Sequence, residues 1–215
     1  MAAIGTRSRF MIRPWRVLSN ATTYQDKYVT MRTDRCENAD GREIYPYHVL
    51  EYPDWVGVVP ITSSGELVLA REYRHGAGEV VLGLPSGTLE PGDATAEAAA
   101  QRELLEETGY AAKQEHFVQL GNLFSNAARH NNRIISFLAW DVRLAACQNL
   151  DENEEIEVVT QEFTACLRMA RRGEGIVQAS HLSALYLAAS FILAESPPEL
   201  AELRREVERE LLRSP

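Results

Sequence analysis

The sequence is short of cysteine, of basic charge and of long apolar runs. Its three cysteines, Cys36, Cys147 and Cys166, lie far apart and form no CxxC or Cys/His spacing, which argues against a disulfide framework and a zinc site. Its 22 basic residues are outnumbered by 31 acidic ones, giving a formal charge of −9. Proteins that bind a nucleic-acid polymer usually present a basic face, so we expect no such partner here, although a small anionic ligand is not excluded.

No segment approaches the roughly 20 apolar residues that are needed to cross a bilayer. The N-terminus, MAAIGTRSRFMIRPW, carries basic residues but no apolar run of signal-peptide length. We therefore expect a cytoplasmic protein with no membrane partner and with reduced thiols.

Strand-like and helix-like segments interleave along the chain, which predicts a mixed α/β fold. We expect a β-rich segment over residues 1–52, a mixed domain over 53–197 and a charged helix, exposed to solvent, over 198–215. Apolar runs bounded by turn residues predict strands at 15–19, 27–33, 44–52, 55–62, 67–74, 79–87, 116–124, 133–142 and 156–163. Helical composition and stop signals predict helices at 96–108, 164–175, 179–194 and 197–215.

The helix predicted at 96–108 is crowded with carboxylates. Glu103, Glu106 and Glu107 are spaced i, i+3, i+4 and therefore share one helical face. The buried stripe of the helix is expected to consist of Ala98, Ala100 and Leu104. The simplest interpretation of the acidic face is a solvated surface whose charge is partly compensated by Arg102.

A metal site is the alternative interpretation. Like charges at this spacing repel by about a few tenths of a kcal/mol per pair, and a divalent cation removes that penalty. Carboxylate oxygens suit Mg²⁺ or Mn²⁺, which commonly bridge to phosphate oxygens. The preceding segment LPSGTLEPGD is a strand end and a Gly/Pro loop that leads into the helix. Strand, loop and acidic helix together indicate a cradle for a metal ion and a diphosphate.

Residues 87–110 resemble the sequence motif of the Nudix hydrolases. Nine positions of this motif occur in order, a pattern specific enough to disfavour the solvated-face interpretation. They are Gly87, Asp93, Arg102, Glu103, Leu104, Glu106, Glu107, Gly109 and Tyr110.

The stretch DWVGVVPITSSGELVLAREYRHGAGEVVLGLPSG is similar to the branch of that family that cleaves ADP-ribose and other nucleoside diphosphate sugars. This resemblance implies the Nudix fold, an α/β/α sandwich with a mixed sheet, preceded by a small β-rich segment that forms a homodimer. It also implies hydrolysis of the diphosphate bond to a nucleoside monophosphate and a sugar phosphate.

The resemblance further implies roles for individual residues. The metal, Mg²⁺ with Mn²⁺ as a possible substitute, would be held by side chains of Glu103 and Glu107, by Glu106 directly or through water, and by the carbonyl of Ser86. Arg102 would orient the glutamates, and Glu154, or failing it Glu152, would take the proton from the attacking water. Arg74 and Arg71 would bind the diphosphate or the terminal sugar; the alternative for both is a surface charge at a strand edge. The acidic loop DENEE, on its own, is typical of a solvated loop.

Three positions depart from the family pattern. Asp93 stands where glutamate is usual and is one residue further from Arg102, Gly83 replaces a common glutamate, and Asn126 replaces a common proline. These departures leave the base and the sugar open. Four aromatic residues are candidates for stacking on a nucleobase or for core packing, namely Trp15, Tyr28, Tyr47 and Trp55.

Two other functions compete with this prediction. One is hydrolysis of another diphosphate, such as a dinucleotide cofactor, coenzyme A or an oxidised nucleotide. The other is a non-catalytic Nudix-like domain that senses a nucleoside diphosphate sugar, although such domains tend to lose the motif glutamates that are retained here.

Overall fold

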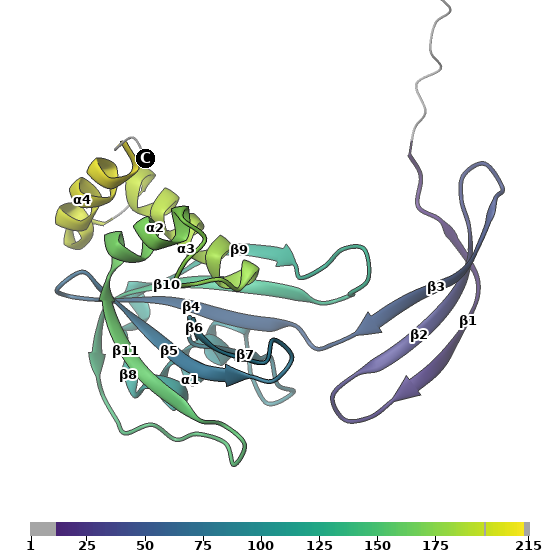
Figure 1. Cartoon of the computed structure of the whole chain (residues 1–215), viewed down its shortest axis with the longest axis horizontal. Coiled ribbons are helices and arrows are strands. Elements are labelled where there is room, and N and C mark those ends of the chain that lie inside the picture. Colours follow the sequence, from purple (N-terminus) through teal and green to yellow (C-terminus); the bar gives the residue numbers. More distant parts are fainter. Residues whose placement is uncertain (1–11, 196, 213–215) are drawn as a thin grey trace, which may run out of the picture. The chain divides into compact units, whose positions relative to one another are not determined.

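Residues 12–195 and 197–212 are described by the structure, a computed structural model of the chain (Figure 1). The chain divides into two compact units. One holds the described residues up to Tyr52 together with Asn126–Asn131, and the other holds Pro53–Ser125 and the chain from Asn132 onward. No helix among the described residues is long and apolar enough to span a bilayer.

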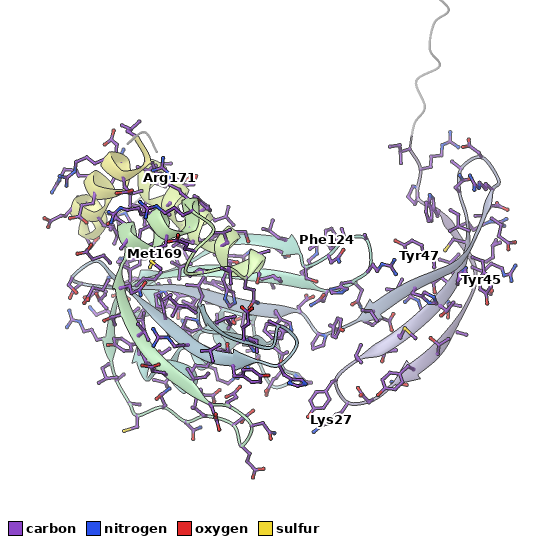
Figure 2. All side chains as sticks on the ribbon, in the orientation of Figure 1. Lys27, Tyr45, Tyr47, Phe124, Met169 and Arg171 are labelled. Carbon is purple, nitrogen blue, oxygen red and sulfur yellow. The ribbon has the colours of Figure 1, made fainter. Side chains whose placement is uncertain are left out.

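The first unit is an antiparallel sheet in the order β1-β2-β3. Its strands are β1 (Arg16–Gln25), β2 (Thr30–Glu37) and β3 (Glu43–Glu51). The loop 126–131 is tied to β3, because the Leu50 N–H donates to the Arg129 carbonyl at 2.7 Å. Tyr47, labelled in Figure 2, also donates its hydroxyl to the Ala128 carbonyl at 2.6 Å.

The second unit is built on a mixed sheet in the order β11-β5-β4-β10-β8, in which β4 and β10 are parallel. Three further strands extend it, since β6 pairs with β5, β7 with β4 and β9 with β10. The strands are β4 (Trp55–Thr62), β5 (Glu66–Arg74), β6 (Glu79–Gly83), β7 (Ser86–Thr88), β8 (Tyr110–Ala111), β9 (Phe117–Phe124), β10 (Arg133–Leu144) and β11 (Ile156–Glu162).

Helices cover both faces of this sheet (Figure 1). They are α1 (Ala96–Thr108), α2 (Phe163–Arg171), α3 (Ala179–Ala194) and α4 (Ala201–Leu212), with 3₁₀ turns at Gln114–His116 and Pro198–Leu200. Side chains alternate along β4, so that Val56 and Val58 join the core under α1 whereas Val59 and Ile61 join the core under the other helices. The predicted α/β/α sandwich with a mixed sheet and a β-rich N-terminal segment is confirmed.

The bounds of α1 are those that the sequence predicts. Thr95 caps its first turn by accepting a hydrogen bond from the Ala98 N–H, and Gly109 ends it with a φ of 75°, a conformation that favours glycine. The buried stripe differs from the prediction at one position, since Ala99 is buried and Ala98 is only half-buried.

The prediction of a solvated C-terminal helix is wrong for one face of α4. Leu203 and Val207 are buried in the core formed with α2 and α3. Glu210 is buried as well, and its carboxylate accepts a hydrogen bond from Arg168 of α2 at 3.0 Å. The mixed charges of this helix conceal an apolar stripe at helical spacing, and that stripe is what attaches it to the domain.

Candidate active site

Two of the three clustered carboxylates on α1 are buried. Glu103 is 8% exposed and Glu107 is 4% exposed, whereas the Glu106 side chain is 37% exposed. The interpretation of this helical face as a solvated surface is therefore wrong for Glu103 and Glu107. Burying carboxylates costs free energy unless a cation or hydrogen-bond donors compensate, so this face of the helix needs a partner.

Strand β7 supplies part of that compensation. The Ser86 N–H donates to Oε2 of Glu107 at 2.9 Å. The next residue, Gly87, packs directly on Glu103, because a Cβ at position 87 would lie 2.1 Å from Oε1 of that carboxylate. A larger residue there would push the Glu103 carboxylate aside. The SG step after Pro85 therefore brings the backbone into contact with both buried carboxylates.

Arg102 links the acidic side chains of the motif. Its guanidinium donates to both carboxylate oxygens of Asp93, at 3.1 and 3.0 Å. It also donates to Oε1 of Glu103 at 2.9 Å and to Oε2 of Glu106 at 3.0 Å. Hydrogen bonding to Arg102 lowers the pKa of Asp93, so Asp93 anchors the guanidinium that orients the glutamates. The extra residue before Arg102 does not break this contact.

A cavity of about 750 Å³ opens in front of these side chains. It is lined by the end of β5, by β7, by the acidic face of α1 and by the loop 149–155, and Trp55 contributes an aromatic side chain. Three of the other predicted residues line it, namely Arg74, Glu152 and Glu154. The sequence motif, the acidic loop and one of the two predicted arginines thus meet at one site.

Burial raises the pKa values of several carboxylates in this cavity. Desolvation raises the pKa of Glu107 to about 8, and neighbouring Glu103, Glu72 and Glu154 add to the effect. Desolvation likewise raises the pKa of Glu103 to about 7, against the opposing charge of Arg102. Burial also raises the pKa of Glu72, a carboxylate that is not among the residues predicted from the sequence. Shifts of this size in a cleft are typical of functional sites.

The two loop glutamates differ in their coupling to the buried carboxylates. Glu154 is among the charges that contribute most to raising the pKa values of Glu72, Glu103 and Glu107, and Glu152 is not. The side chain of Glu154 also accepts a hydrogen bond from the Asp151 N–H at 3.1 Å. This loop is joined to α1, because the Asn149 N–H donates to the Glu106 carbonyl at 2.9 Å. Glu154 is therefore the better placed of the two candidates for a general base.

The two predicted arginines face different surroundings. Arg74 lines the cavity and forms an ion pair with Glu72, which lies on the same face of β5. Arg71 is not among the residues that line this cavity; it pairs with Glu157 of β11 at 2.9 Å. The structure thus brings Arg74, but not Arg71, to the carboxylates.

The remaining sequence candidates lie in other surroundings. Trp15 packs edge-on against Tyr47, and Lys27 lies over the ring of Tyr28, all within the first unit. Asn126 builds the turn of the loop 126–131, where its side chain accepts a hydrogen bond from the Ala128 N–H at 3.2 Å.

The donor set of the cavity fits a hard divalent cation of the Mg²⁺ class. Across residues 12–195 and 197–212, no three histidine, cysteine, aspartate or glutamate side chains converge closely enough to hold a metal ion by themselves. Mg²⁺ seldom needs such a cage, because it is usually held by one or two carboxylates, with water and substrate phosphates completing its shell. Two buried carboxylates with raised pKa values, packed on a glycine backbone, match that mode of binding.

Comparisons with known proteins agree with this geometry. Residues 51–175 match the model of the NUDIX domain, and residues 15–50 match that of the nucleoside diphosphate sugar hydrolase N-terminal domain. The chain is 28% identical to the ADP-ribose pyrophosphatase of Bacillus subtilis (strain 168) over 127 residues, which are 59% of this chain and 67% of that relative.

Two further comparisons cover different shares of the chain. The ADP compounds hydrolase NudE of Escherichia coli (strain K12) is 32% identical over 104 residues, 48% of this chain and 55% of the relative. A crystal structure of an ADP compounds hydrolase matches with a TM-score of 0.72 at 24% identity, over 86% of this chain and 98% of that one, which establishes a common fold. With more than half of its length matched by the NUDIX model, the chain belongs to the Nudix hydrolase family, whose members hydrolyse nucleoside diphosphate derivatives.

Proposed function

We propose that the protein hydrolyses the diphosphate bond of a nucleoside diphosphate sugar, ADP-ribose or a close relative, with Mg²⁺ as its cofactor and Mn²⁺ as a substitute. The products are a nucleoside monophosphate and a sugar phosphate. The observation that carries the proposal is the pair of buried carboxylates, Glu103 and Glu107, whose pKa values are raised to about 7 and about 8 at the wall of an open polar cavity. A site that holds protonated or cation-bound carboxylates and is lined by Arg74 suits an anionic ligand bound through a metal.

The acidic face of α1 and the start of β7 supply the proposed metal ligands. Glu103 and Glu107 hold the cation, with Glu106 as a direct or water-mediated ligand and the Ser86 carbonyl as a backbone ligand. When bound, the cation neutralises the diphosphate and acidifies a water molecule. Arg102, fixed by Asp93, keeps the glutamate side chains oriented. These assignments are supported by the positions of all five groups along one wall of the site.

Proton transfer and substrate binding are assigned to other residues that line the cavity. Glu154 accepts a proton from the attacking water, and its electrostatic coupling to both buried carboxylates supports this role over Glu152. Arg74 binds a phosphate oxygen, and to do so it must break its ion pair with Glu72. Trp55, one of the aromatic residues that line this cavity, is the sequence-predicted candidate for contact with the base or sugar.

The choice of a nucleoside diphosphate sugar is supported by the relatives. One is named an ADP-ribose pyrophosphatase and another an ADP compounds hydrolase, so an adenine nucleotide is the first substrate to test. The match of residues 15–50 to an N-terminal domain of nucleoside diphosphate sugar hydrolases favours a sugar as the second half of the substrate.

A homodimer is part of the proposal. Large apolar side chains of the first unit stay exposed in a single chain, and a surface of this kind commonly serves as a protein interface. They include Trp15 at 47%, Val17 at 50%, Tyr24 at 53% and Tyr28 at 67% exposed. Size-exclusion chromatography with light scattering should give twice the mass of the 24.1 kDa chain. A monomer at micromolar concentration would remove this part of the proposal without touching the chemistry.

Phosphate release across a substrate panel tests the proposed activity. ADP-ribose, ADP-glucose, UDP-glucose, GDP-mannose, NADH and coenzyme A are incubated with the protein and Mg²⁺ or Mn²⁺, and a phosphatase liberates phosphate from the products. Selective cleavage of one nucleoside diphosphate sugar supports the proposal, and selective cleavage of NADH or coenzyme A replaces it with the rival hydrolase. Silence across the panel, in a protein that still binds Mn²⁺, points to a sensor.

A further inference from the structure

A buried histidine lies behind the metal wall of the site and outside the cavity. His181, in the first turn of α3, is 4% exposed and belongs neither to the sequence motif nor to the residues that line the cavity. A polar side chain is costly to bury unless it is hydrogen-bonded, so its partners indicate its role. The two ring nitrogens of His181 face residue 84, just after β6, and residue 86, the first of β7.

The hydrogen bonds of His181 fix its tautomer. Nδ1 lies 3.1 Å from the Leu84 backbone nitrogen, which is a donor only, so Nδ1 must be the acceptor. A neutral ring then carries its proton on Nε2, which lies 3.2 Å from the Ser86 hydroxyl oxygen and donates to it. Burial lowers the pKa of His181 to about 4, so the neutral ring and both hydrogen bonds persist at neutral pH.

Ser86 connects the histidine to the carboxylate wall. Its hydroxyl accepts from His181, while its backbone N–H donates to Oε2 of Glu107 at 2.9 Å. The imidazole spans Pro85 and holds the residue on either side of it, and the Pro85 carbonyl is itself held by the Val58 N–H at 3.0 Å. His181 thus contacts both residues that flank Pro85, including the residue whose amide binds Glu107.

Glycine at position 83 leaves space for the imidazole ring of His181. A Cβ at Gly83 would lie 2.7 Å from Nδ1 and 2.9 Å from Cε1 of His181, so any other residue at position 83 would displace the imidazole. Gly83 is the position at which the family pattern usually has a glutamate. In this chain, the space beside the backbone at position 83 is taken by a histidine from a distant helix.

We propose that His181 is a positioning residue of the metal site: through the Ser86 hydroxyl, it holds the Ser86 amide where that amide orients the Glu107 carboxylate. This inference rests on the proposed role of Glu107 as a metal ligand. Partners that orient a ligand typically contribute about 10- to 100-fold to metal affinity or activity. A histidine that merely fills the core would affect folding stability and leave metal affinity unchanged.

Two replacements of His181 separate its two hydrogen bonds. His181→Asn can keep an acceptor for the Leu84 N–H but is too short to reach Ser86. His181→Gln reaches Ser86 with an amide donor and gives up the contact to Leu84. Mn²⁺ binding is measured without substrate, by electron paramagnetic resonance of the free ion and by calorimetry, and thermal unfolding is recorded in EDTA.

The proposal predicts a specific order of Mn²⁺ affinities. His181→Asn should bind Mn²⁺ about 10-fold more weakly than the wild type, and His181→Gln should recover most of that loss. Ser86→Ala removes the same hydrogen bond from the other side, should weaken Mn²⁺ binding similarly, and should add little when combined with His181→Asn. His116→Asn, the same change at a histidine stacked on Trp140, should leave Mn²⁺ affinity unaltered.

Mn²⁺ affinity within about twofold of the wild type in folded His181→Asn would overturn the inference, and so would equal losses in the Asn and Gln variants. If His181→Asn does not fold, Ser86→Ala decides alone, because it deletes one hydroxyl and leaves the backbone in place. Glu107→Gln separates this inference from the proposed function. Undiminished Mn²⁺ binding in that variant removes the ligand assignment itself, whereas lost binding there and normal binding in Ser86→Ala removes only the role of His181.

Discussion

Replacing Glu107 by Gln should stabilise the metal-free protein at alkaline pH while abolishing its turnover. Glu107 is buried, and its pKa is raised to about 8 from a usual value of 4.5. A carboxyl group whose pKa is raised by folding contributes its full stabilisation at pH values below its unfolded-state pKa of 4.5. That stabilisation is lost as the pH rises through the folded-state pKa of about 8. Gln keeps the size of the side chain and an oxygen for the Ser86 N–H, and it carries no charge.

The expected magnitude follows from the size of the shift. One pKa unit corresponds to about 1.4 kcal/mol. Between pH 5.5 and pH 8.5, the wild type should therefore lose on the order of 3 kcal/mol of unfolding free energy that the Gln variant keeps. For a chain of this length, each kcal/mol moves the melting temperature by about 2–4 °C, so the variant should gain roughly 6–12 °C on the wild type over this pH interval.

Thermal unfolding in EDTA at pH 5.5 and 8.5 measures this difference. Glu208→Gln, at an exposed position of α4, is the matched control and should show no pH-dependent gain. Adding Mn²⁺ at pH 8.5 should raise the melting temperature of the wild type and leave that of Glu107→Gln unmoved, since the wild-type carboxylate is then paired with a cation. A Glu107→Gln variant with the melting temperature of the wild type at both pH values, or with full turnover, would refute the reasoning.

Three further predictions concern the roles of individual side chains. Glu154→Gln should lower kcat by about 100-fold or more with Mn²⁺ affinity largely kept, whereas Glu152→Gln should not; the reverse result would move the general base to Glu152. Arg74→Ala should lower kcat/KM by about 10- to 100-fold through the loss of a charge-assisted phosphate contact, and Arg71→Ala, outside the cavity, should stay within about twofold. Asp93→Asn should cost about 10-fold in kcat, because the guanidinium beside it loses its bidentate partner; wild-type kinetics would show that this anchor is dispensable.

Local signals in the sequence were sufficient for most elements of the fold. The helix α1 begins and ends as predicted because Thr95 caps one end and Gly109 supplies the left-handed residue at the other. The strands β4 and β5 are recognisable because their valine and leucine runs are bounded by the SSGE turn. Such signals depend on neighbours along the chain, so they survive without knowledge of tertiary contacts.

The site was predictable where its residues share one element, and less so where separate elements meet. The spacing of Glu103 and Glu107 places both carboxylates on one face, but only packing against β7 reveals that they are buried. Glu72 was missed, although strand alternation with Arg74 would have placed it on the same face of β5. Arg71 was included because its charge was visible in the sequence and its ion pair with β11 was not.

Gly83 shows why a departure from a family pattern is hard to interpret from sequence alone. In the sequence alone, it is a lost glutamate and therefore argues for a weaker site. In three dimensions, the missing side chain is what admits His181, a residue nearly a hundred positions later that reaches the segment between β6 and β7. Contacts of this kind leave no periodicity or spacing to detect, because the two residues meet only when α3 packs against the sheet. The metal wall therefore depends on a contact outside the motif, and the same argument predicts that restoring glutamate at position 83 would displace the imidazole rather than repair the site.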